Sequence, residues 1–386
     1  MRCVLVCDTY EPHKNSAANL LSDLVNFCSR ELGFRFDIFT ISDLDYDLQN
    51  HNVNLFKYKK DLKRKRLFTR AFYEFFSGIY FCFLYFKHRL KCNYDVVFYY
   101  NPTILQVVFI AFLKFRYPKS VFVLILRDIF PDWAIELGII RSKILQYILY
   151  FLKALNIKIA DIVYCESSNK LSHVTNKFPN TDTEILYNWS NFQPITSKKS
   201  NDPIKHFIYA GNVGEAQDIT SCVPFFIRLL NAGHKIDFYA EGRELASLKE
   251  ALVCTKNVNY IEPVSPQVLD SRLSKYDGGF VFLAQSLSLD NIPGKILTYL
   301  KGGLPVFGAV NSRSELSSII NDNNLGLVVD DRLTFCSDEY RVGMLRLCDE
   351  LDTGAIVGQA SKVFGVENAV RKILLDIENI KSKKAT

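Results

Sequence analysis

Gly211 and Gly214 flank a short turn that contains Asn212, directly after the apolar run at residues 206–210. Such a run is typical of a buried strand, and glycines at its end let backbone N–H groups approach a phosphate closely. A helix after the turn would add the positive end of its dipole. The spacing matches neither G-x-G-x-x-G nor a Walker loop. The alternative is an ordinary strand-to-helix turn.

Lys295 belongs to a second candidate anion site, in the segment 288–303, SLDNIPGKILTYLKGG. Pro293 favours the start of a helix, which puts Lys295 in its first turn. Cations are stabilised at the other end of a helix, so a lysine here indicates an adjacent anion. A solvated surface lysine is the alternative. Asp290 and Asn291 offer acceptors for hydroxyl groups.

Polar residues also follow apolar runs in the first half of the chain. Asp128 comes after residues 121–126, and Lys14 and Asn15 lie in the loop after residues 2–7. For Asp128 the alternative is a turn closed by an Asx-type hydrogen bond. No histidine has an acid and a serine or cysteine partner at motif spacing, so a catalytic triad is unsupported.

These candidates are positioned by an alternation of strands and helices. The expected strands are 2–7, 36–40, 95–100, 121–126, 162–165 and 184–187, then 206–210, 235–239, 278–283 and 304–308. The expected helices are 16–32, 104–115 and 144–157, then 222–232, 295–301 and 369–380. Apolar strands that alternate with helices predict an α/β fold with doubly wound parallel sheets. Ligands bind at the carboxyl ends of such strands.

The polar stretch 193–203, QPITSKKSNDP, separates two such series and is typical of a linker. We therefore expect two Rossmann-like domains, at residues 1–192 and 204–368, that face a cleft. Residues 369–386 form a C-terminal helix and tail that can pack back on the first domain.

Several ordered motifs carry a family resemblance. The second half contains "YAGNVGEAQDI", "FYAEGREL", "VNYIEPVSPQVLDSRLSKYDGGFVFL" and "IPGKILTYLKGGLPVFGA". Their order and spacing resemble the donor-binding domain of family 4 glycosyltransferases, which have the GT-B fold. The first half is similar more weakly, through "LRDIFPD" and "LYNWSNF". The nearest branch builds bacterial O-antigen, lipopolysaccharide and capsule, and includes acetamido-fucosyl transferases.

The resemblance implies how the donor is held. In that family two glutamates separated by seven residues contact the nucleotide sugar, and the matching positions are Asp290 and Thr298. Asp290, with Asn291, would contact the sugar. Thr298 would contact the ribose, although it lacks the carboxylate that accepts two hydrogen bonds. Asp128 would lie beside the reacting centre, and Lys14 and Asn15 on the acceptor side.

The same resemblance implies which groups hold the diphosphate. The family has an Arg/Lys pair after the first strand of this domain, where this chain has Asn212 and Gln217. Lys295 is then the remaining cation for the diphosphate, together with the turn at Gly211 and Gly214.

The resemblance implies a retaining, metal-independent glycosyltransferase without a cofactor, with the UDP-sugar as substrate. It would move a HexNAc or deoxy-HexNAc to a polyprenyl-diphosphate-linked glycan. The first domain would bind the acceptor and the second the donor. The D-x-D spacings at residues 43–47 follow an expected strand, but a solvated polar loop is favoured over a metal site. The alternatives are a UDP-sugar epimerase or phosphorylase of the same fold, and a non-catalytic GT-B scaffold subunit.

Charge is concentrated in one segment. The 386-residue chain has a formal net charge of +6, but residues 57–91 hold eleven basic and two acidic residues. Diffuse basic charge is therefore absent, which argues against a nucleic-acid partner. Aromatic residues follow the basic run, so an anionic membrane surface is one interpretation and a sheet-covering helix the other. The cations expected at lipid are Lys63, Arg64, Lys65, Arg66 and Arg70.

Ten cysteines are scattered without C-x-x-C spacing, which disfavours a zinc site or a disulfide framework and fits a reducing cytosol. No stretch is long and apolar enough for a confident membrane span. The expected location is cytoplasmic, peripheral on the inner face of the cytoplasmic membrane.

Overall fold

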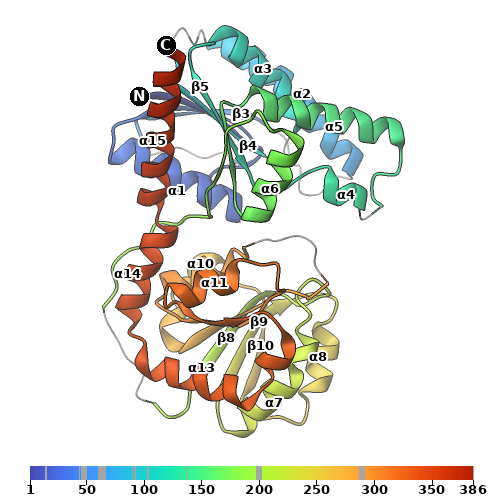
Figure 1. Cartoon of the computed structure of the whole chain (residues 1–386), viewed down its shortest axis with the longest axis vertical. Helices are drawn as coiled ribbons and strands as arrows, with labels where there is room; N and C mark the ends of the chain where they lie inside the picture. Colours follow the sequence, from blue (N-terminus) through green and yellow to red (C-terminus); the bar gives the residue numbers. More distant parts are fainter. Residues whose placement is uncertain are drawn as a thin grey trace. The chain divides into compact units, whose positions relative to one another are not determined.

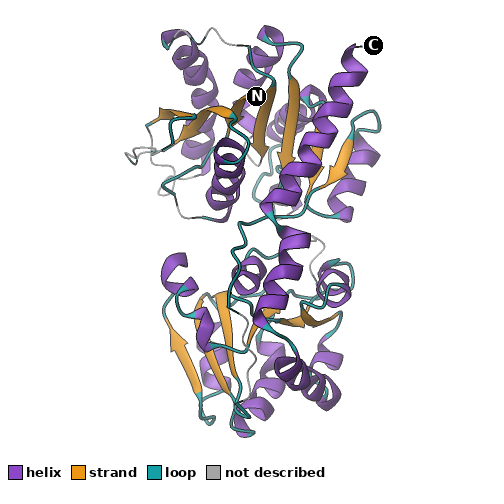
Figure 2. Ribbon diagram, turned by 90° about the vertical axis from the view of Figure 1, so that its left-hand side faces the viewer, coloured by secondary structure: helices purple, strands orange, loops and turns teal. Residues whose placement is uncertain are grey.

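The computed structural model describes residues 1–13, 15–42, 44, 50–59, 67–88, 90, 93–101, 104–136, 138–196, 202–286 and 292–385. The chain divides into two compact units (Figure 1). Unit 1 comprises Met1–Tyr187 and Ala369–Thr386, and unit 2 comprises Asn188–Asn368. Each unit is a parallel sheet with helices on both faces (Figure 2).

Unit 1 is built on a seven-stranded parallel sheet in the order β3-β2-β1-β4-β5-β6-β7. The strands are β1 Arg2–Val6, β2 Arg35–Ile41, β3 Val53–Tyr58, β4 Val96–Asn101, β5 Val121–Leu126, β6 Ile162–Cys165 and β7 Thr183–Ile185. The central strands β4 and β5 are buried throughout, which is why they read as continuous apolar runs. The strand order reverses between β1 and β4, so loops at their carboxyl ends diverge and leave room for a ligand.

The helices of unit 1 form two layers. They are α1 Ser16–Arg30, α2 Leu67–Lys87, η1 Ile104–Gln106, α3 Val107–Arg116, α4 Asp132–Glu136, α5 Lys143–Ile159, α6 Ser168–Lys177 and α15 Val366–Ala385. A core that includes Phe39, Phe81, Phe109 and Ile157 packs α2, α3 and α5 on one face of the sheet. On the opposite face α15 joins the sheet, where Tyr164 of β6 donates a 2.7 Å hydrogen bond to Asp376.

Unit 2 is built on a six-stranded parallel sheet in the order β10-β9-β8-β11-β12-β13. Its strands are β8 His206–Asn212, β9 Lys235–Glu241, β10 Val258–Ile261, β11 Gly278–Phe282, β12 Val306–Ala309 and β13 Gly326–Val329. Its helices are η2 Thr220–Cys222, α7 Val223–Asn231, α8 Leu245–Ala251, α9 Pro266–Asp270, η3 Leu273–Lys275, α10 Lys295–Lys301, α11 Leu316–Asp322, α12 Arg332–Phe335, α13 Asp338–Glu350 and α14 Thr353–Phe364.

The α/β doubly wound architecture predicted from the sequence is confirmed by these two sheets. Strands β3, β10 and β13 were not predicted, and each lies at or next to the edge of its sheet. An edge strand is only partly buried, as the mixed burial of Val53–Tyr58 shows, so its apolar pattern is weak. Among the described residues no helix is long and apolar enough to cross a membrane.

Candidate functional site

A cavity of about 240 Å³ opens at the carboxyl edge of the unit 2 sheet. Its walls come from the ends of β8 and β9, the segment after β10, and α10. It is lined by Ala210, Gly211, Tyr239, Glu241, Pro263, Val264, Leu269, Lys295, Thr298 and Tyr299. Three residues singled out from the sequence, Gly211, Lys295 and Thr298, therefore meet in one cavity.

The ammonium group of Lys295 lines this cavity and is largely shielded from water. Its Nζ lies 3.9 Å from the centroid of the Tyr209 ring, a cation–π contact. Burial lowers the pKa of Lys295 to about 7, and no carboxylate among the described residues contributes to that pKa. A desolvated cation without a counter-ion is unfavourable, so an anion in the cavity would restore the charged form.

Gly211 makes room for that lysine. Its φ is +132°, in a region that residues with a side chain rarely adopt. A Cβ on Gly211 would lie 3.1 Å from Lys295 Nζ, closer than ordinary van der Waals contact. The N–H of Ala210 donates a 2.8 Å hydrogen bond to the Tyr299 hydroxyl, which fixes α10 against the end of β8.

The cavity has a polar and an apolar part. Lys295 and Thr298 come from the first turns of α10, whereas Pro263, Val264 and Leu269 come from the segment after β10. Apolar walls suit a flat ring, a hydroxyl suits a sugar hydroxyl, and a cation suits a phosphate. The cavity therefore offers a surface for each of these three kinds of group.

The turn after β8 differs from its prediction. Strand β8 extends through Asn212, so Gly211 is the last but one residue of a strand. No helix begins directly after Gly214, because the next helical element is η2, at Thr220. The expected helix dipole is thus absent from this described turn. Asn212 instead donates a 2.9 Å hydrogen bond to Gln217, and neither Asn212 nor Gly214 lines the cavity.

Arg332 joins three loops of unit 2 and was not foreseen. Its guanidinium donates to the carbonyl oxygens of Ala309 and Gln217 at 2.8 Å and of Leu283 at 3.1 Å. Ala309 is the last residue of β12, Gln217 lies in the loop after β8, and Leu283 directly follows β11. Arg332 lies after β13, in a stretch whose sequence carries no motif, so only the folded chain identifies it.

Unit 1 gathers polar groups at the carboxyl edge of its own sheet. Asp128 follows β5 and is exposed, and Arg127 beside it forms a 2.7 Å ion pair with Glu166. Burial raises the pKa of Tyr100, on which Arg127 and Asp128 also act. Asn101, at the end of β4, is buried, and neither of its side-chain polar atoms has a hydrogen-bond partner among the described residues.

The other predicted site residues are placed as follows. Asn15 is the N-cap of α1, where it accepts a 2.8 Å hydrogen bond from the N–H of Ala18. Arg70 lies in α2. The predictions for Lys14, Asp290, Asn291, Lys63, Arg64, Lys65 and Arg66 lie outside the described residues. Among those that are described, no group of three or more His, Cys, Asp or Glu residues could hold a metal ion.

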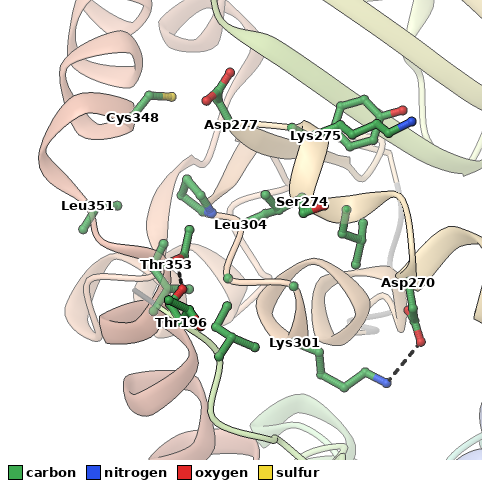
Figure 3. A pocket seen from close by; sticks show the side chains of 17 residues that line it. Thr196, Asp270, Ser274, Lys275, Asp277, Lys301, Leu304, Cys348, Leu351 and Thr353 are labelled. Atoms are coloured by element: carbon green, nitrogen blue, oxygen red, sulfur yellow. Dashed lines mark hydrogen bonds and ion pairs between the residues drawn. The ribbon is translucent and has the colours of Figure 1, made fainter. Parts of the chain in front are cut away.

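A larger cavity, of about 340 Å³, lies at the opposite edge of the unit 2 sheet (Figure 3). Its lining includes Asp277 and Pro305, which precede β11 and β12. Lys301 points away from the centre of this cavity, and its Nζ lies 3.9 Å from Oδ2 of Asp270. Ligands of doubly wound sheets bind at the carboxyl ends of strands, which favours the cavity at Lys295 over this one.

No protein-family model and no curated protein sequence matches the chain. Solved structures do match it along its whole length. Sucrose-phosphate synthase from Thermosynechococcus elongatus has a TM-score of 0.68 at 12% identity, with 99% of this chain and 100% of that chain covered. The lipopolysaccharide outer core galactosyltransferase WaaB has a TM-score of 0.61 at 12% identity, with 100% of each chain covered. The Anabaena protein HepE, solved in complex with UDP, has a TM-score of 0.61 at 12% identity, with 98% of this chain and 100% of that chain covered. The chain has the GT-B fold.

Proposed function

We propose that this GT-B chain is a retaining, metal-independent glycosyltransferase that takes its sugar from a UDP-sugar. The observation that carries the proposal is the largely shielded ammonium of Lys295, without a carboxylate partner among the described residues, at the carboxyl edge of the unit 2 sheet. Similarity to a synthase, a galactosyltransferase and a protein solved with UDP supports it. The sugar would be a HexNAc or deoxy-HexNAc.

Unit 2 would bind the donor. Lys295 would neutralise the diphosphate, and the backbone of Gly211 would approach it closely because no side chain intervenes. The hydroxyl of Thr298 would contact the ribose, and Pro263 with Val264 would enclose the uracil ring. Asn212 and Gly214 would border the diphosphate from the turn after β8, and Asp290 and Asn291 would contact the sugar.

Unit 1 would bind the acceptor. Asp128 is exposed at the end of β5, where a carboxylate can orient a hydroxyl. Asn101 is buried nearby without a hydrogen-bond partner among the described residues, an arrangement that an acceptor hydroxyl would relieve. Lys14 and Asn15 would belong to the same side. The acceptor would be a polyprenyl-diphosphate-linked glycan of O-antigen, lipopolysaccharide or capsule synthesis, at the inner face of the cytoplasmic membrane.

The proposed step breaks the bond between the sugar C1 and the diphosphate and forms a bond from C1 to the acceptor oxygen on the same face. The acceptor proton goes to the departing phosphate oxygen. Negative charge grows on the diphosphate as the bond breaks, so a protonated Lys295 stabilises the transition state more than the ground state.

Calorimetric titration with UDP, followed by mass spectrometry of the full chain with a panel of UDP-sugars and a lipid-linked acceptor, tests the proposal. We expect UDP to bind and one donor to extend the acceptor. Absence of UDP binding would instead indicate a non-catalytic scaffold. Turnover of a UDP-sugar without acceptor would indicate the epimerase alternative.

The ribose role of Thr298 makes a separate prediction. Thr298→Val keeps the shape of the side chain but removes its hydroxyl, so we expect UDP to bind about three- to tenfold more weakly, the worth of one hydrogen bond. Thr298→Ser, which keeps the hydroxyl, is the matched control. Thr298→Val should not lower the affinity for the analogue, 2′-deoxy-UDP or 3′-deoxy-UDP, that lacks the hydroxyl which Thr298 contacts. An equal loss for UDP and both deoxy analogues would rule out the ribose contact.

A further inference from the structure

Helix α2 is apolar on both of its faces. Its inner face buries Phe81, Leu84 and Tyr85 against the unit 1 sheet. On its outer face Phe83 and Phe86 are 56% and 64% exposed, and they are not part of that core. A helix that covers a sheet in water normally carries polar residues on its outer face. The outer face of α2 therefore lacks the composition of a solvent-facing surface.

Helix α5 repeats this feature. Its residues Ile144, Tyr147, Ile148 and Phe151 follow the spacing of one helical stripe, and that stripe points away from the core. Ile144 and Tyr147 are each 76% exposed. The opposite stripe, with Leu149 and Ile157, is buried. Two helices of the same layer thus present apolar residues outward.

Helix α3 connects these two stripes. It packs against both α2 and α5 on the same side of the sheet (Figure 1). The Phe112 ring contacts the ring of Phe86 at 5.4 Å between centroids. Phe115, one turn further along, is 88% exposed. We call the outer surfaces of α2, α3 and α5 the three-helix face. Contiguous exposed apolar patches on a protein often mark an interaction site.

The exposed charges that the structure describes on the three helices are all basic, because Glu74 of α2, the one acidic residue in these helices, is buried. Residues 96–126 and 138–160, which include α3 and α5, contain no aspartate or glutamate. Exposed cations lie at the ends of these helices: Lys87 ends α2, Arg116 ends α3 and Lys119 follows it, and Arg141 and Lys143 lie at the start of α5. Lys153 is not among these exposed cations, because it turns inward to Asp132.

This combination selects one kind of partner. A second copy of the chain would bring one set of these cations against another, which like-charge repulsion opposes. A nucleic acid would satisfy the cations but not the phenylalanine, isoleucine and tyrosine side chains between them. An anionic lipid surface satisfies both, since its headgroups attract the cations and its acyl boundary accepts the apolar side chains.

We propose that the three-helix face docks on the surface of a membrane that contains anionic lipid, with α2, α3 and α5 lying along the interface. The proposal does not depend on the transferase activity. The apolar contact would come from three helices that are far apart in the sequence.

Sedimentation of the full chain with vesicles tests the proposal. We expect binding to vesicles of phosphatidylcholine with phosphatidylglycerol, at least tenfold weaker binding to pure phosphatidylcholine, and weakening as salt is raised. The double variants Ile144→Ser/Phe151→Ser and Phe83→Ser/Phe86→Ser should each lower the affinity for anionic vesicles at least tenfold. Val253→Ser/Leu333→Ser is the matched control, because these residues are 76% and 88% exposed in unit 2. This control should bind like the unaltered protein.

Two further measurements separate docking from its competitors. Circular dichroism should give the same spectrum and a similar Tm for all variants and for the unaltered protein, which shows that the variants are folded. Light scattering without vesicles should give the same molar mass for the variants and the unaltered protein. The proposal is overturned if the unaltered protein does not bind anionic vesicles, if it binds neutral ones equally, or if the face variants bind as well as the control. A dimer that only the face variants dissociate would assign the face to a second copy.

Discussion

Replacing Lys295 by methionine should weaken the binding of UDP by about ten- to a hundredfold or more, the worth of a charge-assisted hydrogen bond. The effect follows from the position of Nζ above the Tyr209 ring, without a carboxylate among the described residues to neutralise it. Methionine fills similar space, so the cavity would keep its shape. Lys301→Met, at the other end of α10, is the matched control, because Lys301 lines the opposite edge of the sheet.

The same lysine should make UDP binding depend on pH. Burial lowers its pKa to about 7 in the free protein, and a bound diphosphate would raise it again. Binding then takes up a proton above pH 7, so the affinity falls as the pH rises. Between pH 7 and 9 the protonated fraction, and with it the affinity, drops by a factor on the order of 50. Calorimetry in buffers of different ionisation enthalpy measures the proton uptake. A flat pH profile in the unaltered protein, or an unchanged slope in Lys295→Met, would contradict the assignment.

The free energy of unfolding should rise with pH, whereas the affinity for UDP should fall. The folded-state pKa of Lys295 lies below its unfolded value, so the unfolded chain binds more protons between about pH 7 and 10.5. The free energy of unfolding therefore rises with pH across that window. Lys295→Met removes the penalty, so its Tm should exceed that of the unaltered protein at pH 7 and converge with it toward pH 10.5. A variant that loses UDP binding while gaining stability separates a binding role from a structural one.

Replacing Arg332 by methionine should destabilise unit 2 by about 3–5 kcal/mol. The carbonyl oxygens of Gln217 and Leu283 would lose the guanidinium donor, and a buried acceptor left unsatisfied costs about 1–3 kcal/mol. The carbonyl oxygen of Ala309 would lose one of two donors, since it also accepts a 3.1 Å hydrogen bond from the N–H of Leu283. The guanidinium also lies 5.2 Å from the centre of the Phe282 ring. Urea unfolding measures the change. Arg332→Lys should be intermediate, since an ammonium cannot reproduce the fork of a guanidinium.

Arg346→Met is the control for Arg332. Arg346 is exposed and, within the described part of the chain, pairs with Glu350 one turn away, so its loss should leave the free energy of unfolding nearly unchanged. Arg332→Met should also weaken UDP binding, because it frees the turn of Asn212 and Gln217 beside the cavity. If Arg332→Met unfolds at the same urea concentration as Arg346→Met, Arg332 does not hold these loops together.

Local patterns located part of the candidate site. Lys295 and Gly211 were found because a lysine in the first turn of a helix and a glycine after an apolar strand are unusual in themselves. Tyr209, Pro263 and Arg332 were not found, because a tyrosine in a strand, a proline in a loop and an arginine after a strand occur everywhere. Their roles depend on which loops the folded sheet brings beside them.

The sequence by itself determined the α/β alternation, because strands buried on both faces are short apolar runs, and the segments between most of them have the periodicity of helices. It also determined the basic segment and the helix at Lys295. Only the tertiary structure decided that Lys295 loses its water above Tyr209, and that the outer stripe of α5 remains exposed. Burial depends on neighbours distant in the chain, such as β8 against α10, and the strand order β10-β9-β8-β11-β12-β13 brings these neighbours together. No local sequence pattern specifies this strand order.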